Sequence, residues 1–152
     1  MGMKLYLDVD GVIVGQNQDG DRVLIPDIEE ILRYSKDNYQ CFWLTTHGRY
    51  STEDVLRYLA PYCIDFEPST FRYIEAARWN TLKTKAIDFS RPFIWIDDQP
   101  LQAEIQELKN HACFRNWLHV DTYRNIYDLA VKKIEERRQE ILRKDQSQNH
   151  NS

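Results

Sequence analysis

Short apolar runs that end in polar side chains recur along the chain and alternate with segments of helical periodicity. The runs that predict strands lie at residues 5–7, 41–44, 93–96 and, more weakly, 117–120. Between them, apolar side chains at helical spacing predict helices that begin near Asp27, Ser51 and Pro100, and a last helix from Ile126 to Arg143. Strands alternating with helices favour a parallel sheet covered on both faces, so we expect an α/β fold, a Rossmann-like three-layer α/β/α sandwich.

The region between the first strand and the first helix predicts a short β-hairpin. Apolar residues at 12–14 and 23–25 flank the turn-forming residues 16–21. The segments between the predicted strands leave no room for a full second domain inserted over the sheet. After Lys144 the sequence is polar and of low complexity. We therefore expect a single domain over residues 1–144 and a disordered polar tail over residues 145–152.

Composition narrows the class of protein without naming a function. The 152 residues are 42% hydrophobic and 29% charged, which is typical of a globular domain, and the net charge of -4 gives no general attraction to nucleic acid or anionic lipid. No apolar run approaches the ~20 residues that a membrane span needs, and the start lacks a signal-like apolar stretch. The three cysteines are widely spaced, so we expect reduced thiols, a cytoplasmic protein and no membrane contact.

Polar side chains follow three of the predicted strands, where the strands end. In a parallel sheet these ends meet at one edge, and ligands bind beyond it. Carboxylates that converge there repel one another unless a cation neutralises them, and carboxylate oxygens are ligands that Mg²⁺ prefers. A single Asp at a strand end is more often a turn former, but a whole set in this order predicts a site. The set is Asp8 and Asp10, Thr45 and Thr46, Lys83, and Asp97 with Asp98.

The first of these groups lies in the sequence LYLDVDGVI at residues 5–13, which resembles the first motif of the haloacid dehalogenase-like (HAD) phosphohydrolase superfamily. The resemblance implies that Asp8 is the nucleophile and that Asp10 is the general acid and base. It also implies that Thr45 binds a phosphoryl oxygen and that Lys83 bridges the phosphate and Asp8. The hairpin then corresponds to a short flap, and the fold to a member without a full cap domain.

The same resemblance implies a Mg²⁺ site. Asp8, the backbone carbonyl of Asp10, and the pair Asp97 and Asp98 would form it. DD-type members of the superfamily favour Asp98 as the direct ligand, while Asp97 holds a metal-bound water or the lysine. Lys85 is an alternative to Lys83. We prefer Lys83 because it stands where a loop leads into a further predicted helix.

The function that these motifs predict is Mg²⁺-dependent hydrolysis of a phosphomonoester through an aspartyl phosphate. Without a cap, the site suits a phosphorylated macromolecule as well as a small molecule. A nucleic acid end is one candidate, because Arg and aromatic side chains follow the threonines and precede the lysine. We expect Thr46, His47 and Arg49 to contact the substrate, with a hydrogen bond within its loop as the alternative for His47. Two interpretations stay open for Arg72, Tyr73, Arg78 and Trp79: they rim the site, or the aromatic side chains pack and the arginines are solvated.

Two alternatives use the same residues. A HAD-like module that binds without catalysis would keep the motifs and lack turnover. A phospho-accepting receiver domain also gathers acidic residues, a Thr and a Lys around Mg²⁺. The order of motifs disfavours the receiver, because its acidic pair follows the first strand and its phospho-acceptor the third, whereas here the pair Asp97 and Asp98 comes late.

Overall fold

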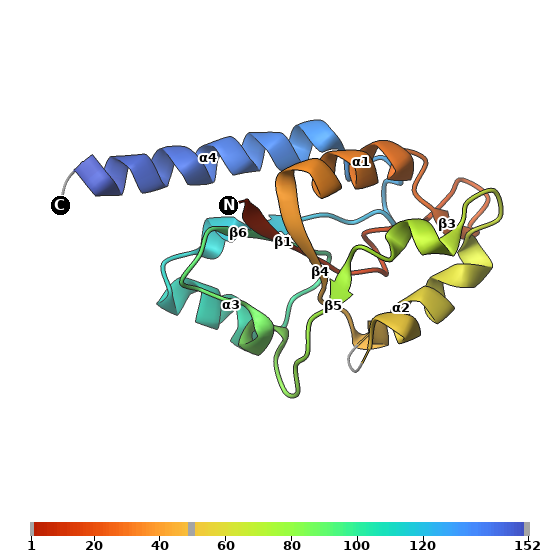
Figure 1. The fold of residues 1–152 in the computed structure, drawn as a ribbon, viewed down its shortest axis with the longest axis horizontal. Coiled ribbons are helices and arrows are strands. Elements are labelled where there is room, and N and C mark those ends of the chain that lie inside the picture. Colours follow the sequence, from red (N-terminus) through yellow and green to blue (C-terminus); the bar gives the residue numbers. More distant parts are fainter. Residues whose placement is uncertain (1, 49–50, 151–152) are drawn as a thin grey trace.

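The predicted α/β architecture with a central parallel sheet is confirmed. A computed structural model of the chain describes residues 2–48 and 51–150 (Figure 1). Its five-stranded sheet has the order β5-β4-β1-β6-β7, with every neighbouring pair parallel. The strands are β1 (Met3–Leu7), β4 (Tyr39–Trp43), β5 (Glu75–Ala76), β6 (Phe93–Asp97) and β7 (Trp117–His119).

The register of β1 brings the ends of three strands to one level. Leu7 is opposite Trp43 of β4 on one side and opposite Ile96 of β6 on the other. The next residue of β1 therefore emerges beside the end of β6, and the residues after Trp43 emerge on its other side. The three central strands thus deliver their following polar residues to one edge of the sheet.

Helices cover both faces of the sheet because its side chains alternate between two apolar clusters. α1 (Ile28–Asn38) and α4 (Val131–His150) lie together on one face, and α3 (Gln102–Asn110) lies on the other (Figure 1). The first cluster contains Leu5 and Leu7 with residues of α1 and α4, and the second contains Tyr6 and Leu108 of α3.

α2 (Thr52–Leu59) follows β4 and begins at Ser51, whose hydroxyl accepts a hydrogen bond from the Asp54 amide at 3.1 Å. The helix ends before Pro61, as the sequence predicts. The predicted hairpin is also present, since β2 (Val14–Gln16) and β3 (Arg22–Leu24) pair antiparallel.

Local hydrogen bonds overturn part of the sequence prediction for the last helix. α4 begins at Val131 rather than Ile126, because residues 121–130 form turns. The Asp128 carboxylate accepts a hydrogen bond from the Asp121 amide at 2.8 Å, and the Asn125 amide donates to the Asp121 carbonyl at 3.1 Å. α4 also continues to His150, into the segment for which we expected a disordered tail.

Two smaller features also differ from the sequence prediction. The third helix, predicted to begin near Pro100, begins at Gln102, and the preceding Leu101 is exposed. The two-residue strand β5 was not predicted, because it is too short to show alternation. None of the described helices combines the length and the apolar character that a membrane span needs, since α4 is long but highly charged.

Truncation of Ile134 will test how α4 is held on the sheet. Ile134 is fully buried in the first apolar cluster, so Ile134→Ala should lower the free energy of unfolding by about 2–4 kcal/mol through lost burial and a cavity. Lys132→Ala, an exposed change on the same helix, is the control and should stay within about 0.5 kcal/mol of the wild type in urea unfolding. Equal effects of the two changes would contradict the packing described for α4.

Candidate functional site

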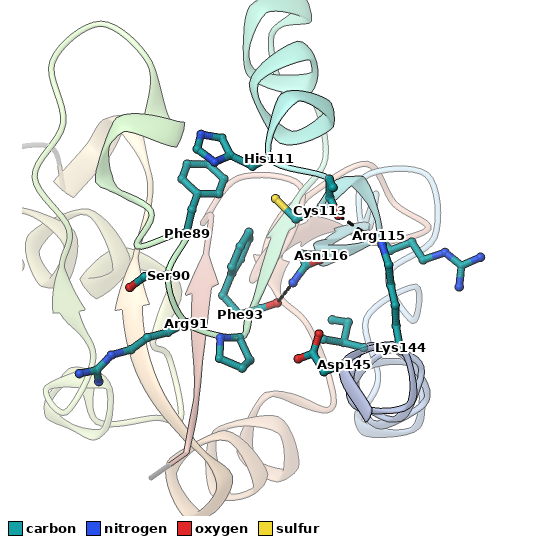
Figure 2. Close-up of a pocket in the computed structure, with 13 residues that line it drawn as sticks. Phe89, Ser90, Arg91, Phe93, His111, Cys113, Arg115, Asn116, Lys144 and Asp145 are labelled. Atoms are coloured by element: carbon teal, nitrogen blue, oxygen red, sulfur yellow. Dashed lines mark hydrogen bonds between the residues drawn. The ribbon is translucent and has the colours of Figure 1, made fainter. Parts of the chain in front are cut away.

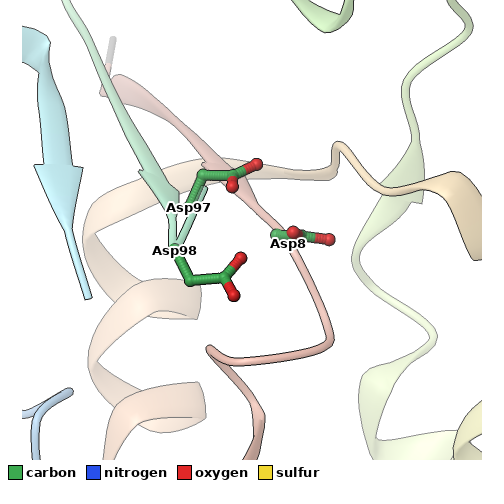
Figure 3. Close-up of side chains that lie close together, drawn as sticks. All are labelled: Asp8, Asp97 and Asp98. Atoms are coloured by element: carbon green, nitrogen blue, oxygen red, sulfur yellow. The ribbon is translucent and has the colours of Figure 1, made fainter. Parts of the chain in front are cut away.

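Three carboxylates meet at the carboxyl edge of the sheet. Asp8 directly follows β1, Asp97 is the last residue of β6, and Asp98 comes next (Figure 3). Each contributes a carboxylate oxygen to a group in which these atoms all lie within 4.8 Å of one another. Asp8 and Asp97 are buried, whereas Asp98 is half-buried.

The Lys83 ammonium lies between two of these carboxylates. Its Nζ is 2.7 Å from Asp97 Oδ2 and 3.2 Å from Asp8 Oδ2, and its side chain is only 13% exposed. Lys85 was the alternative for this place, but its exposed ammonium pairs with Glu107 of α3 at 3.3 Å. The structure therefore brings Lys83 to the carboxylates and directs Lys85 away from them.

A buried glutamate of α3 holds the turn that carries this lysine. Lys83 begins a 3₁₀ turn, Lys83–Ala86, and its amide donates to Glu104 Oε2 at 2.5 Å. The other oxygen of Glu104 accepts a hydrogen bond from the Leu101 amide at 2.8 Å. Glu104 thus ties the Lys83 turn to the segment that follows Asp98, and both segments carry site residues.

Crowding of negative charge perturbs the protonation of the cluster. Burial and the nearby Asp97 carboxylate raise the pKa of Asp8 to about 7, against the opposing effect of the Lys83 ammonium. Burial and Asp97 likewise raise the pKa of Asp98 to about 6. Burial would lower the pKa of Lys83, but the carboxylates of Asp8 and Asp97 outweigh it and raise that pKa. One ammonium therefore offsets only part of the charge of three carboxylates.

Gly11 permits the close approach of Asp98. Its φ is +75°, a left-handed conformation that favours glycine, and a Cβ placed there would lie 2.6 Å from Asp98 Cγ. The Gly11 carbonyl also accepts a hydrogen bond from the Thr122 amide at 2.8 Å, which joins the loop after β1 to the loop after β7.

The residues after β4 are only partly at the cluster. Thr45 is 1% exposed, and its hydroxyl lies beside Asp8, where it lowers the pKa of that carboxyl. Its carbonyl accepts a hydrogen bond from Trp79 Nε1 at 3.4 Å. Thr46 is exposed at the start of the 3₁₀ turn Thr46–Gly48, and Arg49 lies outside the described residues.

Asp10 occupies a separate place from the three clustered carboxylates. Its Oδ2 is 2.6 Å from His47 Nε2, and its Oδ1 accepts a hydrogen bond from the Tyr58 hydroxyl at 2.6 Å. His47, expected to contact substrate, therefore contacts the side chain of Asp10. A second phenol, that of Tyr123, lies near Asp10. Burial and the Asp10 carboxylate raise the pKa of Tyr123 to about 12.

Two of the residues that could rim the site, Arg72 and Tyr73, follow the other interpretation, an exposed arginine and a packed tyrosine. The Tyr73 hydroxyl hydrogen-bonds with Ser35 at 2.8 Å and donates to the Leu32 carbonyl at 3.0 Å, so Tyr73 lies against α1. Arg72 forms an exposed ion pair with Glu53 at the start of α2. Both side chains are engaged by the helices that they pack against, and this cannot be read from their sequence position.

Glu104 and the two tyrosines near Asp10 were not predicted from the sequence, and only Glu104 has a signal there. Glu104 stands at the third position of α3, where a glutamate reaches back to the backbone of the helix start, as in a capping box. Tyr58 and Tyr123 give no comparable signal, because a tyrosine on a helix or in a loop is most often a packing residue.

Asp8, Asp97 and Asp98 fit a hard divalent cation. Three convergent carboxylates with only one ammonium between them leave negative charge uncompensated, and oxygen ligands are those that Mg²⁺ takes. The arrangement fits the metal site expected from the sequence at these three residues. The Asp10 carboxylate is directed to His47 and Tyr58 instead, so any contact of Asp10 with the metal involves its backbone.

A cavity of about 270 Å³ lies at the opposite end of β6 (Figure 2). Phe89, Phe93 and Cys113 contribute to its wall, and burial raises the pKa of the Cys113 thiol to about 11. The Arg91 and Arg115 side chains extend away from it in different directions (Figure 2). His111, Lys144 and Asp145 also line it, but in the described part of the chain no hydrogen bond or ion pair joins these side chains to one another or to Cys113. The carboxylate cluster is therefore the candidate site.

The fold and the cluster define an α/β protein with a lysine-bridged aspartate site at the carboxyl edge of a parallel sheet. Comparison of the chain with protein-family models, curated proteins and solved structures gives no match.

Mg²⁺ should stabilise the protein more at pH about 8 than at pH about 5. Asp8 and Asp98 have folded-state pKa values of about 7 and about 6 against an ordinary 3.8, so the metal-free fold loses stability as pH rises from about 4 to 7. Mg²⁺ bound at the ionised carboxylates would reverse this loss. Thermal melts with Mg²⁺ or with a chelator, recorded at both pH values, measure the Mg²⁺-dependent rise in melting temperature.

Asp98→Asn should reduce the Mg²⁺-dependent rise in melting temperature, whereas Asp65→Asn should not. Asp65 is the control because it is exposed and lies beside α1. A shift that is the same at both pH values, or the same in both variants, would contradict a metal site at this cluster.

Gly11→Ala should disturb both the fold and the cluster. The left-handed φ and the contact with Asp98 predict a loss of about 1–3 kcal/mol of stability and a weaker Mg²⁺-dependent melting shift. Gly20→Ala is the matched control, because Gly20 also has a positive φ but a Cβ placed there would have no neighbouring atom closer than 3.8 Å. Equal loss of the Mg²⁺ shift in the two variants would show that Gly11 has no particular relation to Asp98.

Proposed function

We propose that the chain is a HAD-like, Mg²⁺-dependent phosphomonoester hydrolase that acts through an aspartyl phosphate on Asp8. The observation that carries the proposal is the buried Lys83 ammonium, in contact with both Asp8 and Asp97 and next to Asp98. A carboxylate nucleophile can approach an anionic phosphate only where positive charge offsets their repulsion. The cluster provides one cation of its own and ligands for another.

Asp8 would attack the phosphorus in line with the ester oxygen. The new P–O bond forms to a carboxylate oxygen of Asp8 as the bond from phosphorus to the ester oxygen breaks, and the leaving oxygen takes a proton from Asp10. Asp10 then removes a proton from water, whose oxygen attacks the same phosphorus. The bond to Asp8 breaks, and inorganic phosphate and both free aspartates are returned.

The other residues would stabilise charge around the phosphoryl group. Lys83 is placed to pair with a phosphoryl oxygen while it holds Asp8, and the Thr45 hydroxyl is beside the same carboxylate. Bound Mg²⁺ at Asp8, Asp97 and Asp98 would neutralise phosphoryl charge as a Lewis acid. Asp97 has its Oδ2 on Lys83 and its Oδ1 on the Gln99 amide, which leaves Asp98 the less engaged of the pair and supports it as a direct ligand.

The substrate class that we propose is a phosphorylated small molecule or macromolecule, a nucleic acid end among them. Support comes from the segment between β1 and α1, because it forms only the short hairpin of β2 and β3 and no cap domain. A panel of sugar phosphates, nucleotides and 5′- and 3′-phosphorylated oligonucleotides separates these substrates.

Asp8→Asn should abolish hydrolysis of 4-nitrophenyl phosphate in the presence of Mg²⁺, with a loss of at least about a thousandfold in kcat. Asn is nearly isosteric but is not a nucleophile toward phosphorus, so the fold should persist in circular dichroism. Asp65→Asn is the matched control and should retain full turnover.

Turnover that survives Asp8→Asn would overturn the proposed mechanism. Background activity of the wild type across the whole panel would favour a binding module. A stable phosphoryl group on Asp8 that water does not remove would favour a phospho-accepting signalling domain.

A further inference from the structure

The side chain of Asp10 is held at both of its oxygens by two stacked rings. Oδ1 accepts a hydrogen bond from Tyr58 Oη at 2.6 Å, and Oδ2 is 2.6 Å from His47 Nε2. The two rings are parallel within 9°, with their centroids 3.6 Å apart. One carboxylate thus contacts the edges of both members of a stacked pair.

Three elements of the fold build this arrangement. Asp10 is in the loop after β1, His47 is in the 3₁₀ turn after β4, and Tyr58 is on α2. The buried side chains of Val55 and Leu59 fix α2 against the apolar core, and therefore fix the rotation that presents Tyr58. Since α2 is anchored separately from β1, its contact with Asp10 constrains the loop that joins the nucleophile to the acid.

The Asp10 carboxylate has one ring partner at each oxygen, the Tyr58 hydroxyl and His47 Nε2. Burial and the Asp10 carboxylate raise the pKa of Tyr58, so the phenol stays protonated and donates a hydrogen bond to Oδ1. His47 Nε2 lies 2.6 Å from Oδ2, within hydrogen-bond distance of that oxygen.

We propose that His47 and Tyr58 are positioning residues that hold the Asp10 carboxyl for proton transfer to the leaving oxygen, and that the substrates are therefore alkyl phosphomonoesters. The inference rests on the proposed phosphohydrolase function. An alkoxide is a poor leaving group and needs a proton as the P–O bond breaks, whereas a nitrophenolate leaves without one. Positioning of Asp10 as an acid therefore affects the first step, which kcat/KM reports, for the alkyl substrate and not for the aryl one.

The test compares an alkyl and an aryl phosphate in the same variants. Tyr58→Phe keeps the ring stack and removes the hydroxyl donor, and His47→Phe keeps a ring and removes the nitrogen donor. Each should lower kcat/KM for glycerol phosphate at least about tenfold more than for 4-nitrophenyl phosphate. His47→Gln, which restores an N–H donor, should recover part of the difference.

Tyr73→Phe is the matched control. It also removes a hydroxyl with two hydrogen bonds, but those bonds are to Ser35 and Leu32 of α1. It should leave the ratio of alkyl to aryl activity unchanged. In an Asp10→Asn background, Tyr58→Phe should no longer change that ratio, because it acts through Asp10.

The outcomes separate this inference from the proposed function. Aryl turnover that depends on Asp8, with alkyl and aryl activity reduced equally by Tyr58→Phe and His47→Phe, would overturn the positioning role alone. Higher alkyl activity in these variants would also overturn it, because the rings would then hold Asp10 away from the reacting oxygen. Absence of Asp8-dependent turnover with either substrate would remove the proposed function and this inference together.

Discussion

The Lys83 ammonium makes it possible to bury two aspartates side by side at the end of a parallel sheet. Asp8 and Asp97 emerge from adjacent strands because β1 and β6 are in register, and without a cation between them their repulsion would oppose that register. Breaking such a buried contact leaves uncompensated charge, which is costly. The turn that carries Lys83 is in turn held by Glu104 of α3, so the helix on one face of the sheet supports the chemistry at its edge.

The same edge provides two different environments for aspartate. Asp8 faces an ammonium and other carboxylates, whereas Asp10, two residues later, faces a phenol and an imidazole from separate elements. Environments that differ in this way are how proteins give carboxylates of one type different roles. The short turn at Gly11 makes the separation possible, because it redirects the chain immediately after Asp10 and admits Asp98 beside it.

The elements that depend on apolar periodicity were predictable, and those that depend on particular hydrogen bonds were not. β1 and β6 are buried along almost their whole length, β4 buries alternate residues, and α1 and α2 each bury one stripe, so their residues identify them. The start of α4 was misplaced because the Asp128 carboxylate caps a turn that competes with the helix. The sequence left two places open for Tyr73 for a related reason, since its partners on α1 are distant in sequence.

The sequence by itself determined the alternation of strands and helices, and with it the edge where the strand-end aspartates gather, because burial patterns and chain direction are local properties. Only the tertiary structure decided between Lys83 and Lys85, which are two residues apart in one turn and chemically identical. The decision follows from the orientation of that turn, which Glu104 and Glu107 impose from α3. The tertiary structure also brought His47 to Asp10, because that contact requires the turn after β4 and the loop after β1 to lie side by side.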